Sequence, residues 1–198
     1  SEPTSNTTLT EDSATSETTT TQETTSEFVY EEITYEMYAN ALQVAFKAGE
    51  EGIDYVTNDG DYIEHGAFAS YYPYTVTSGY GVFVNDEIVT ELYEQTCEQV
   101  LSLDLSDKSN LQWVEEENYQ IIYAYITGIH DLNLMLGEDM DYVYEYAEGF
   151  GMDANEMSII NFWFFANNQL ISTIVFTEDD EGREAMDTFI SELGLPEV

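Results

Sequence analysis

The segment from Met157 to Thr177, MSIINFWFFANNQLISTIVFT, decides the fold class of this chain. It contains two apolar runs, rich in β-branched and aromatic residues, on either side of Asn167 and Asn168. Asparagine tolerates the positive φ angles of a tight turn, so the segment predicts an antiparallel hairpin. The first run, IINFWFFAN, is apolar at consecutive positions. This pattern is typical of a strand covered on both faces, and we expect it in the interior of a sheet.

A helix is predicted directly after this hairpin, in the segment TEDDEGREAMDTFISELGLPEV. Thr177 and Asp180 have the spacing of a capping box at its start. Met186, Phe189 and Leu193 recur at helical spacing and form an apolar stripe. A glycine and a proline near the end of the segment then stop the helix. The unit formed by this segment is therefore a hairpin followed by a helix.

The same order of elements is predicted twice earlier in the chain. In the first copy, YYPYTVTSGYGVFVN has β-rich runs around Ser78 and Gly79, and residues 86–103 form a helix with Asn85 as its N-cap. In the second copy, we predict strands over 111–115 and 119–127.

The helix of the second copy is predicted within MDYVYEYAEGFGM, after a less regular stretch from Gly128 to Asp139. Asp131 or Asp139 could cap it. The strand segment LQWVEEENYQ is rich in charge, and charged strands belong at the edge of a sheet. An amphipathic helix over 31–49 precedes all three copies, followed by a loop from Thr57.

These elements predict an α+β fold for residues 28–198, taken as one acidic globular domain. The expected layout is an N-terminal helix followed by three hairpin-helix (ββα) units. Six strands would form an antiparallel sheet, with the helices packed on one face.

Residues 1–27 have a very different composition, with sixteen Ser or Thr, six acids, and only Pro3, Leu9 and Ala14 as apolar residues. Such a segment cannot bury enough apolar area to offset the entropy of ordering it, so we predict a disordered stalk or linker. In composition it resembles the spacer that follows the lipid-bearing cysteine of Gram-positive surface lipoproteins. The resemblance implies an extracellular, cell-surface location, with attachment to the membrane only through a lipid anchor upstream of Ser1.

The charge of the chain limits its partners. It contains 41 acidic residues but only three basic ones, Lys47, Lys108 and Arg183, which gives a formal net charge of −38. Binding to nucleic acid depends mainly on Lys and Arg neutralising phosphate, so the composition excludes this class of partner. Anionic membrane surfaces are disfavoured for the same reason. Such a charge either serves solubility or favours cations and basic proteins.

Two sets of side chains are candidate binding residues. Asp59, Asp61 and Glu64 lie in and after a turn-rich loop, where carboxylates could hold calcium, although their spacing does not match an EF-hand. Tyr119, Tyr123 and Tyr125 share one face of a predicted strand with Ile121, and tyrosine serves well on protein and glycan binding surfaces. The alternative role of these tyrosines is to fill the core.

No catalytic residues or cofactors are predicted, apart from the calcium that the loop could bind. His65 and His130 each adjoin a carboxylate, but neither belongs to a metal-binding helical pair, and no nucleophile elbow or phosphate-binding loop is present. We therefore expect a surface-anchored, non-enzymatic binding domain for a protein or glycan ligand outside the cell. The alternatives are an extracellular hydrolase with paired carboxylates, and an acidic inhibitor or decoy of a basic protein.

Overall fold

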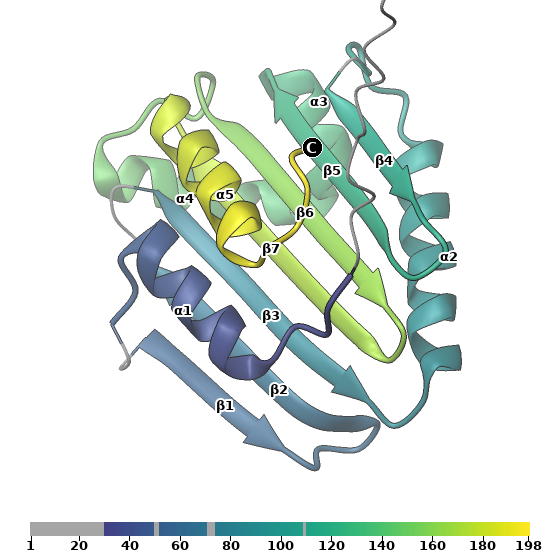
Figure 1. Ribbon diagram of the computed structural model, residues 1–198. Helices are drawn as coiled ribbons and strands as arrows, with labels where there is room; N and C mark the ends of the chain where they lie inside the picture. The colour runs from purple at the N-terminus through teal and green to yellow at the C-terminus, as the bar shows by residue number, and fades with distance from the viewer. Residues whose placement is uncertain (1–29, 50–51, 71–73, 109) are drawn as a thin grey trace, which may run out of the picture.

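The computed structural model describes residues 30–49, 52–70, 74–108 and 110–198, except for the side chains of Tyr146 and Phe150. The predicted stalk over 1–27 lies outside these residues. The strands among the described residues form one antiparallel sheet of seven strands (Figure 1). Their order across the sheet is β1 (Ile53–Thr57), β2 (Tyr62–Ser70), β3 (Thr75–Phe83), β7 (Gln169–Thr177), β6 (Ser158–Ala166), β5 (Gln120–Thr127) and β4 (Leu111–Glu115).

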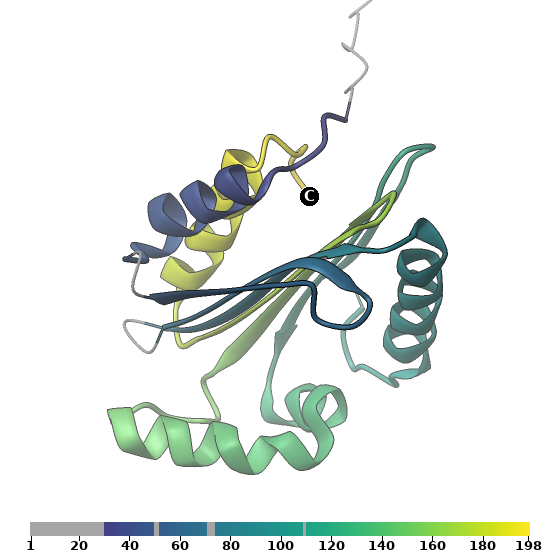
Figure 2. The same cartoon turned by 90° about the horizontal axis from the view of Figure 1, so that it is seen from below.

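Helices cover both faces of this sheet, which corrects the expectation that they lie on one face (Figure 2). One face, called here the α1/α5 face, carries α1 (Tyr35–Phe46) and α5 (Asp180–Glu192). The other, called the α2/α4 face, carries α2 (Asp86–Ser102), α3 (Ile129–Leu136), the 3-10 turn η2 (Gly137–Asp139) and α4 (Met140–Phe150). The physical reason is that the central strands are apolar on both sides. A single helix layer would leave one of these sides in water.

The clearest sequence predictions are confirmed in the second half of the chain. β6 and β7 form the expected hairpin, and Asn167 has the positive φ of +49° that the turn requires. β6 lies between β7 and β5 and is almost entirely buried. The charged strand β4 lies at the edge of the sheet, and among the described strands it pairs with β5 alone.

The layout predicted for the first hairpin-helix unit is wrong. Ser78 and Gly79 lie in the middle of β3, where the backbone pairs with β2 on one side and β7 on the other. The turn of the first hairpin lies instead between β1 and β2, where Asn58 and Gly60 have positive φ angles. The sheet consequently has seven strands and not six. A serine-glycine pair is compatible with a turn or with a crowded strand, and only pairing with distant strands decides between them.

The helix ends follow local chemistry closely. Asn85 caps α2 as predicted, because its side chain accepts a hydrogen bond from the Ile88 amide at 3.1 Å. The N-cap of α5 is Asp179, which accepts from the Glu181 amide, so the predicted capping box of Thr177 and Asp180 is wrong.

The remaining helices differ from the predicted ones mainly in length. The predicted helix over 31–49 is shorter and runs from Tyr35 to Phe46. The stretch read as irregular before α4 contains α3. Asp139 occupies the N-cap position of α4, without a side-chain capping bond.

The core of the α1/α5 face is largely aromatic, with Tyr38, Phe162 and Phe189 fully buried. Three of its polar side chains form a chain of hydrogen bonds. The Tyr38 hydroxyl donates to Ser78 Oγ at 3.0 Å, and Ser78 Oγ lies 2.7 Å from Thr173 Oγ1. Because buried polar groups are costly when unpaired, this chain of hydrogen bonds fixes α1 in register with β3 and β7.

Candidate functional site

The strand register brings three small residues into one row on the α2/α4 face. Ala67 of β2 pairs with Gly79 of β3, and Gly79 pairs with Ser172 of β7. The next residue in this row is Trp163 of β6, which packs against the clusters under α2 and α4. Where the helices cover this face, the row holds the large side chain of Trp163. Next to the helices, the row holds small residues.

The small residues form the floor of an open hollow of about 300 Å³. We call this hollow the sheet groove. Its floor is made by Ala67, Thr77, Gly79, Gly81 and Ser172. Its larger lining side chains are Tyr62, His65, Phe83, Leu170 and Ile174. A concave surface with a mostly apolar lining and a few polar groups is the usual form of a ligand site.

Two glycines in the floor have opposite roles. A Cβ on Gly79 would meet only Gly66 O and His65 Nε2, both at 3.9 Å, so the space above Gly79 is open. A Cβ on Gly81 would lie 2.9 Å from Tyr62 Cε1, so the Tyr62 ring already occupies the space above Gly81. Gly81 therefore lets an aromatic ring lie on the strand, whereas Gly79 leaves the groove empty.

An aromatic stack closes the end of the sheet groove near α2. The rings of Tyr62 and His65 are stacked, with centroids 4.7 Å apart and planes 17° from parallel. Tyr62 also packs against Phe83, with centroids 4.6 Å apart. Flat aromatic surfaces of this kind bind sugar faces, peptide groups and cations.

A second hollow, of about 260 Å³, lies at the other end of the groove, between the sheet and the α3 to α4 segment. We call it the apolar hollow. Leu136, Val143, Ile174 and Phe176 provide its apolar lining, and Asp139 lies at it as well. Ile174 lines both hollows, so the sheet groove and the apolar hollow are adjacent along β7.

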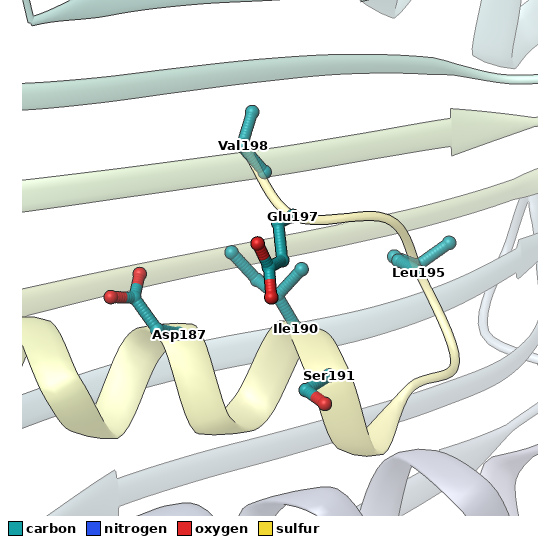
Figure 3. Close-up of a pocket in the computed structure, with 6 residues that line it drawn as sticks. All are labelled: Asp187, Ile190, Ser191, Leu195, Glu197 and Val198. Atoms are coloured by element: carbon teal, nitrogen blue, oxygen red, sulfur yellow. The ribbon is translucent and has the colours of Figure 1, made fainter. Parts of the chain in front are cut away.

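A third cavity, of about 330 Å³, lies on the opposite side of the molecule, between α5 and the segment that follows it (Figure 3). Asp187 and Glu197 both line it, with Ile190 and Leu195 beside them. Desolvation raises the pKa of the Asp187 carboxyl; Arg183 opposes the shift, and the charges of Glu197 and Glu184 add to it. This is the place in the described structure where two carboxylates share a cavity and one has a raised pKa.

The three predicted binding tyrosines lie on the α1/α5 face, far from the sheet groove in the fold. They share this face with Ile121, as predicted, but Tyr119 and Tyr123 are buried in the core. Tyr125 is half-buried, and the guanidinium of Arg183 lies 5.2 Å from its ring centroid. The cation expected from a basic partner is thus supplied at Tyr125 by the chain itself.

The predicted calcium ligands lie around the β1 to β2 turn. Asp59 and Asp61 are exposed in the turn, and Glu64 is on β2. Desolvation raises the pKa of the Tyr55 hydroxyl, and the neighbouring Glu64 adds to this shift. Among the described residues, no group of three or more His, Cys, Asp or Glu side chains is placed to hold a metal ion. Calcium binding at this turn stays a prediction.

Asp131 has a structural role, because its carboxylate is bound by a residue of the loop after α2. Its carboxylate accepts hydrogen bonds from the Ser106 amide and hydroxyl, and these bonds lower the pKa of the Asp131 carboxyl. The neighbouring His130 is exposed. Asp131 therefore joins α3 to the loop after α2.

Comparisons with known proteins give little further information. No family model matches the chain, and no curated protein gives a significant match. The extracellular domain of PknH from Mycobacterium tuberculosis is similar over 79% of this chain and 91% of its own, with 6% identity and a TM-score of 0.41. A GTP binding regulator from Thermotoga maritima is similar over 81% and 90%, with 11% identity and a TM-score of 0.29. Both scores are below 0.5, so neither protein assigns a fold family or a function to this chain.

Within the described residues, no helix combines the length and the apolar character that a membrane span would need.

The residues of the sheet groove were not predicted from the sequence. A signal was present, because Gly79 and Gly81 alternate with larger residues in a β-rich run, and glycine inside a strand often marks close approach of a ligand or a ring. Because Ser78 and Gly79 were predicted to form a turn, the alternation of Gly79 and Gly81 within one strand was not recognised.

Proposed function

We propose that this chain is a non-enzymatic binding domain displayed outside the cell, and that the sheet groove is its ligand site. The observation that carries the proposal is the row of small residues, Ala67, Gly79 and Ser172, on a sheet face that helices cover elsewhere. A strand face lined by small side chains contributes little to a core. It instead leaves space for another molecule against the backbone.

The extracellular location rests on the composition of residues 1–27 and on their likeness to lipoprotein spacers. A polar stalk of this kind would hold the domain away from the membrane, with the lipid anchor upstream of Ser1. A protein or a glycan could then reach the groove.

A groove-filling substitution tests the ligand site. Gly79→Val would place two methyl groups in the open space, and because glycine weakens a strand interior by roughly 0.5–1 kcal/mol, the variant should fold at least as well as the wild type. Gly49→Val is the matched control, since Gly49 also has open space around it and lies after α1.

The measurement is binding of the full chain to an array of glycans and an array of basic, neutral and acidic peptides. We expect ligands of the wild type to be retained by Gly49→Val and lost by Gly79→Val. Retention by Gly79→Val, or no ligand for the wild type on either array, would contradict the proposal.

A second candidate function is hydrolysis by paired carboxylates, and the cavity of Asp187 and Glu197 is the observation that favours it. A carboxyl with a raised pKa can act as a general acid beside an ionised partner. Turnover of a panel of aryl glycosides that is abolished by both Asp187→Asn and Glu197→Gln would support this activity. Absence of turnover by the wild-type chain would eliminate it.

A further inference from the structure

The apolar hollow is large enough for an anchoring side chain. A cavity of about 150 Å³ lined by aliphatic and aromatic groups holds a benzene ring. The apolar hollow offers about 260 Å³, and its walls are Leu136, Val143, Ile174 and Phe176. One aromatic or branched aliphatic side chain of a partner would fit in it and would be removed from water.

The surface beside the apolar hollow has exposed aromatic and apolar side chains. Tyr142, which lines the hollow, is 72% exposed, and Tyr144, two residues further along α4, is 41% exposed. Leu134 of α3 is 36% exposed. Large side chains left in water on one segment are typical of a surface that meets a partner, because tyrosine gives a rigid contact area with a polar end.

The same segment is strongly acidic. A shallow hollow on η2 and α4 is lined by Glu138, Asp139, Asp141 and Glu145, together with Tyr142 and Tyr144. We call this surface the acidic ridge. Residues 129–150 contain no Lys or Arg. Asp139 lines both the acidic ridge and the apolar hollow, so negative charge directly borders the space for an apolar anchor.

None of the three cations of the chain belongs to this segment. Lys47 is the C-cap of α1, Lys108 lies in the loop after α2, and Arg183 is on α5, over the ring of Tyr125. A second copy of the chain would bring a formal charge of −38 against another −38 and is disfavoured. A neutral glycan would leave the acids without a counter-charge. The charge therefore selects a basic occupant.

We propose that the apolar hollow and the acidic ridge bind a basic segment of a partner protein. An aromatic or branched aliphatic side chain of this segment enters the apolar hollow, and its Lys or Arg side chains lie against Asp139, Glu138 and the ring of Tyr142. The chain then continues along β7 into the sheet groove. This proposal rests on the function proposed above, because it names the partner of the same concave face.

The test uses the full chain and labelled synthetic peptides. The first peptide has one Phe among several Arg and Lys residues. In the second the Phe is replaced by Ala, and in the third the basic residues are replaced by Gln. Fluorescence anisotropy measures Kd at low salt and at about 0.15 M salt, where the Debye length is about 8 Å.

We expect the first peptide to bind, and to bind more weakly as salt increases. Loss of the Phe should weaken binding by about tenfold or more, since tenfold is near the lower end of what burial of one aromatic side chain contributes. The third peptide should not bind. Binding of the first and third peptides with equal Kd would overturn the proposal.

Variants separate local recognition from the general field of the molecule. Glu138→Gln, Asp139→Asn and Glu145→Gln combined remove three charges from the acidic ridge. Glu91→Gln, Glu94→Gln and Glu98→Gln combined remove three charges from exposed positions on α2 and are the matched control. We expect about a tenfold or larger loss of peptide affinity in the first set and less than about twofold in the second. Equal losses would mean that only the net charge attracts the peptide.

The outcomes also separate this inference from the proposed function. If no basic peptide binds but a glycan does, and Gly79→Val blocks the glycan, the groove is a ligand site and the basic partner is wrong. If a basic peptide binds the acidic ridge but Gly79→Val has no effect on any ligand, the ridge is an interaction surface and the groove is not a ligand site. Tyr142→Ala, at a largely exposed position, should weaken only the basic peptides.

Discussion

The ring of Tyr62 lies directly on the backbone of Gly81, where a Cβ would be 2.9 Å from Tyr62 Cε1. The same Cβ would be 3.0 Å from Phe83 Cε2. Gly81 is therefore required for the position of Tyr62, and Tyr62 in turn closes the end of the sheet groove with His65 stacked on it. The shape of the candidate site depends on the absence of one methyl group.

Gly81→Ala should destabilise the protein by about 1–3 kcal/mol, the usual range for overpacking a site without free space. The cost should be smaller when Tyr62→Ala is already present, because the ring that the methyl group displaces is absent. Urea unfolding of the wild type, both single variants and the double variant measures this coupling. Additive free energies of unfolding would show that the two residues do not interact in the way described.

Gly182→Ala should destabilise the protein by about 1–3 kcal/mol, even though alanine is the better helix former by about 1 kcal/mol. A Cβ on Gly182 would lie 2.6 Å from Thr177 Cβ, so α5 would have to move away from the end of β7. Gly149→Ala on α4 is the matched control, since no described atom beyond its chain neighbours and the backbone of its own helix lies within 4 Å of its Cβ position.

The control should be more stable than the wild type by up to about 1 kcal/mol, because it gains helix propensity without a clash. Thermal unfolding of both variants gives the comparison. A stable Gly182→Ala variant would mean that the contact between α5 and β7 is looser than the structure shows.

Replacement of Asp131 by Asn should lower stability at neutral pH, since the amide is a weaker acceptor for the Ser106 amide and hydroxyl. Because these hydrogen bonds lower the pKa of Asp131, the folded state binds fewer protons than the unfolded state as the pH falls through about 4. The stabilisation by Asp131 is therefore present above this range and lost below it. The difference in free energy of unfolding between wild type and Asp131→Asn should shrink as the pH falls from 6 toward 3, a range of about 3 pH units around the usual Asp pKa. A difference that does not change with pH would contradict the assignment.

Added salt should stabilise the protein, because a formal charge of −38 repels itself most strongly at low ionic strength. Thermal unfolding in NaCl, MgCl₂ and CaCl₂ at matched ionic strength should show rising Tm in all three. The prediction of calcium binding by Asp59, Asp61 and Glu64 adds a specific requirement. Calcium would have to give a further, saturable shift that is lost in Asp59→Asn combined with Asp61→Asn. Identical behaviour of CaCl₂ and MgCl₂ would show that the charge is only screened.

Local chemistry by itself predicted the elements whose signals are contained in adjacent residues. The turn at Asn167 and Asn168 needs a positive φ, which asparagine tolerates. The helix after Asn85 begins there because the Asn85 side chain accepts a hydrogen bond from the Ile88 amide, which has no partner within the helix. Strand 158–166 is apolar at nearly consecutive positions and rich in β-branched and aromatic residues, which together indicate a strand that is buried on both faces.

Where the local sequence was compatible with more than one conformation, contacts between distant segments determined which one formed. Ser78 and Gly79 have the composition of a turn, yet they lie inside β3 because β2 and β7 satisfy their backbone on both sides. The placement of helices on both faces depends on how seven strands are ordered, and strand order is set by contacts between residues far apart in the chain.

The candidate site belongs entirely to this second category. Ala67, Gly79 and Ser172 are unremarkable as separate residues, and only the pairing of β2, β3 and β7 places them in one row. The sequence determined an acidic α+β chain with particular turns and caps, because those depend on neighbouring residues. The groove, its aromatic end and its proximity to the acidic ridge depend on register and packing between distant segments, and these are fixed only when the whole sheet has formed.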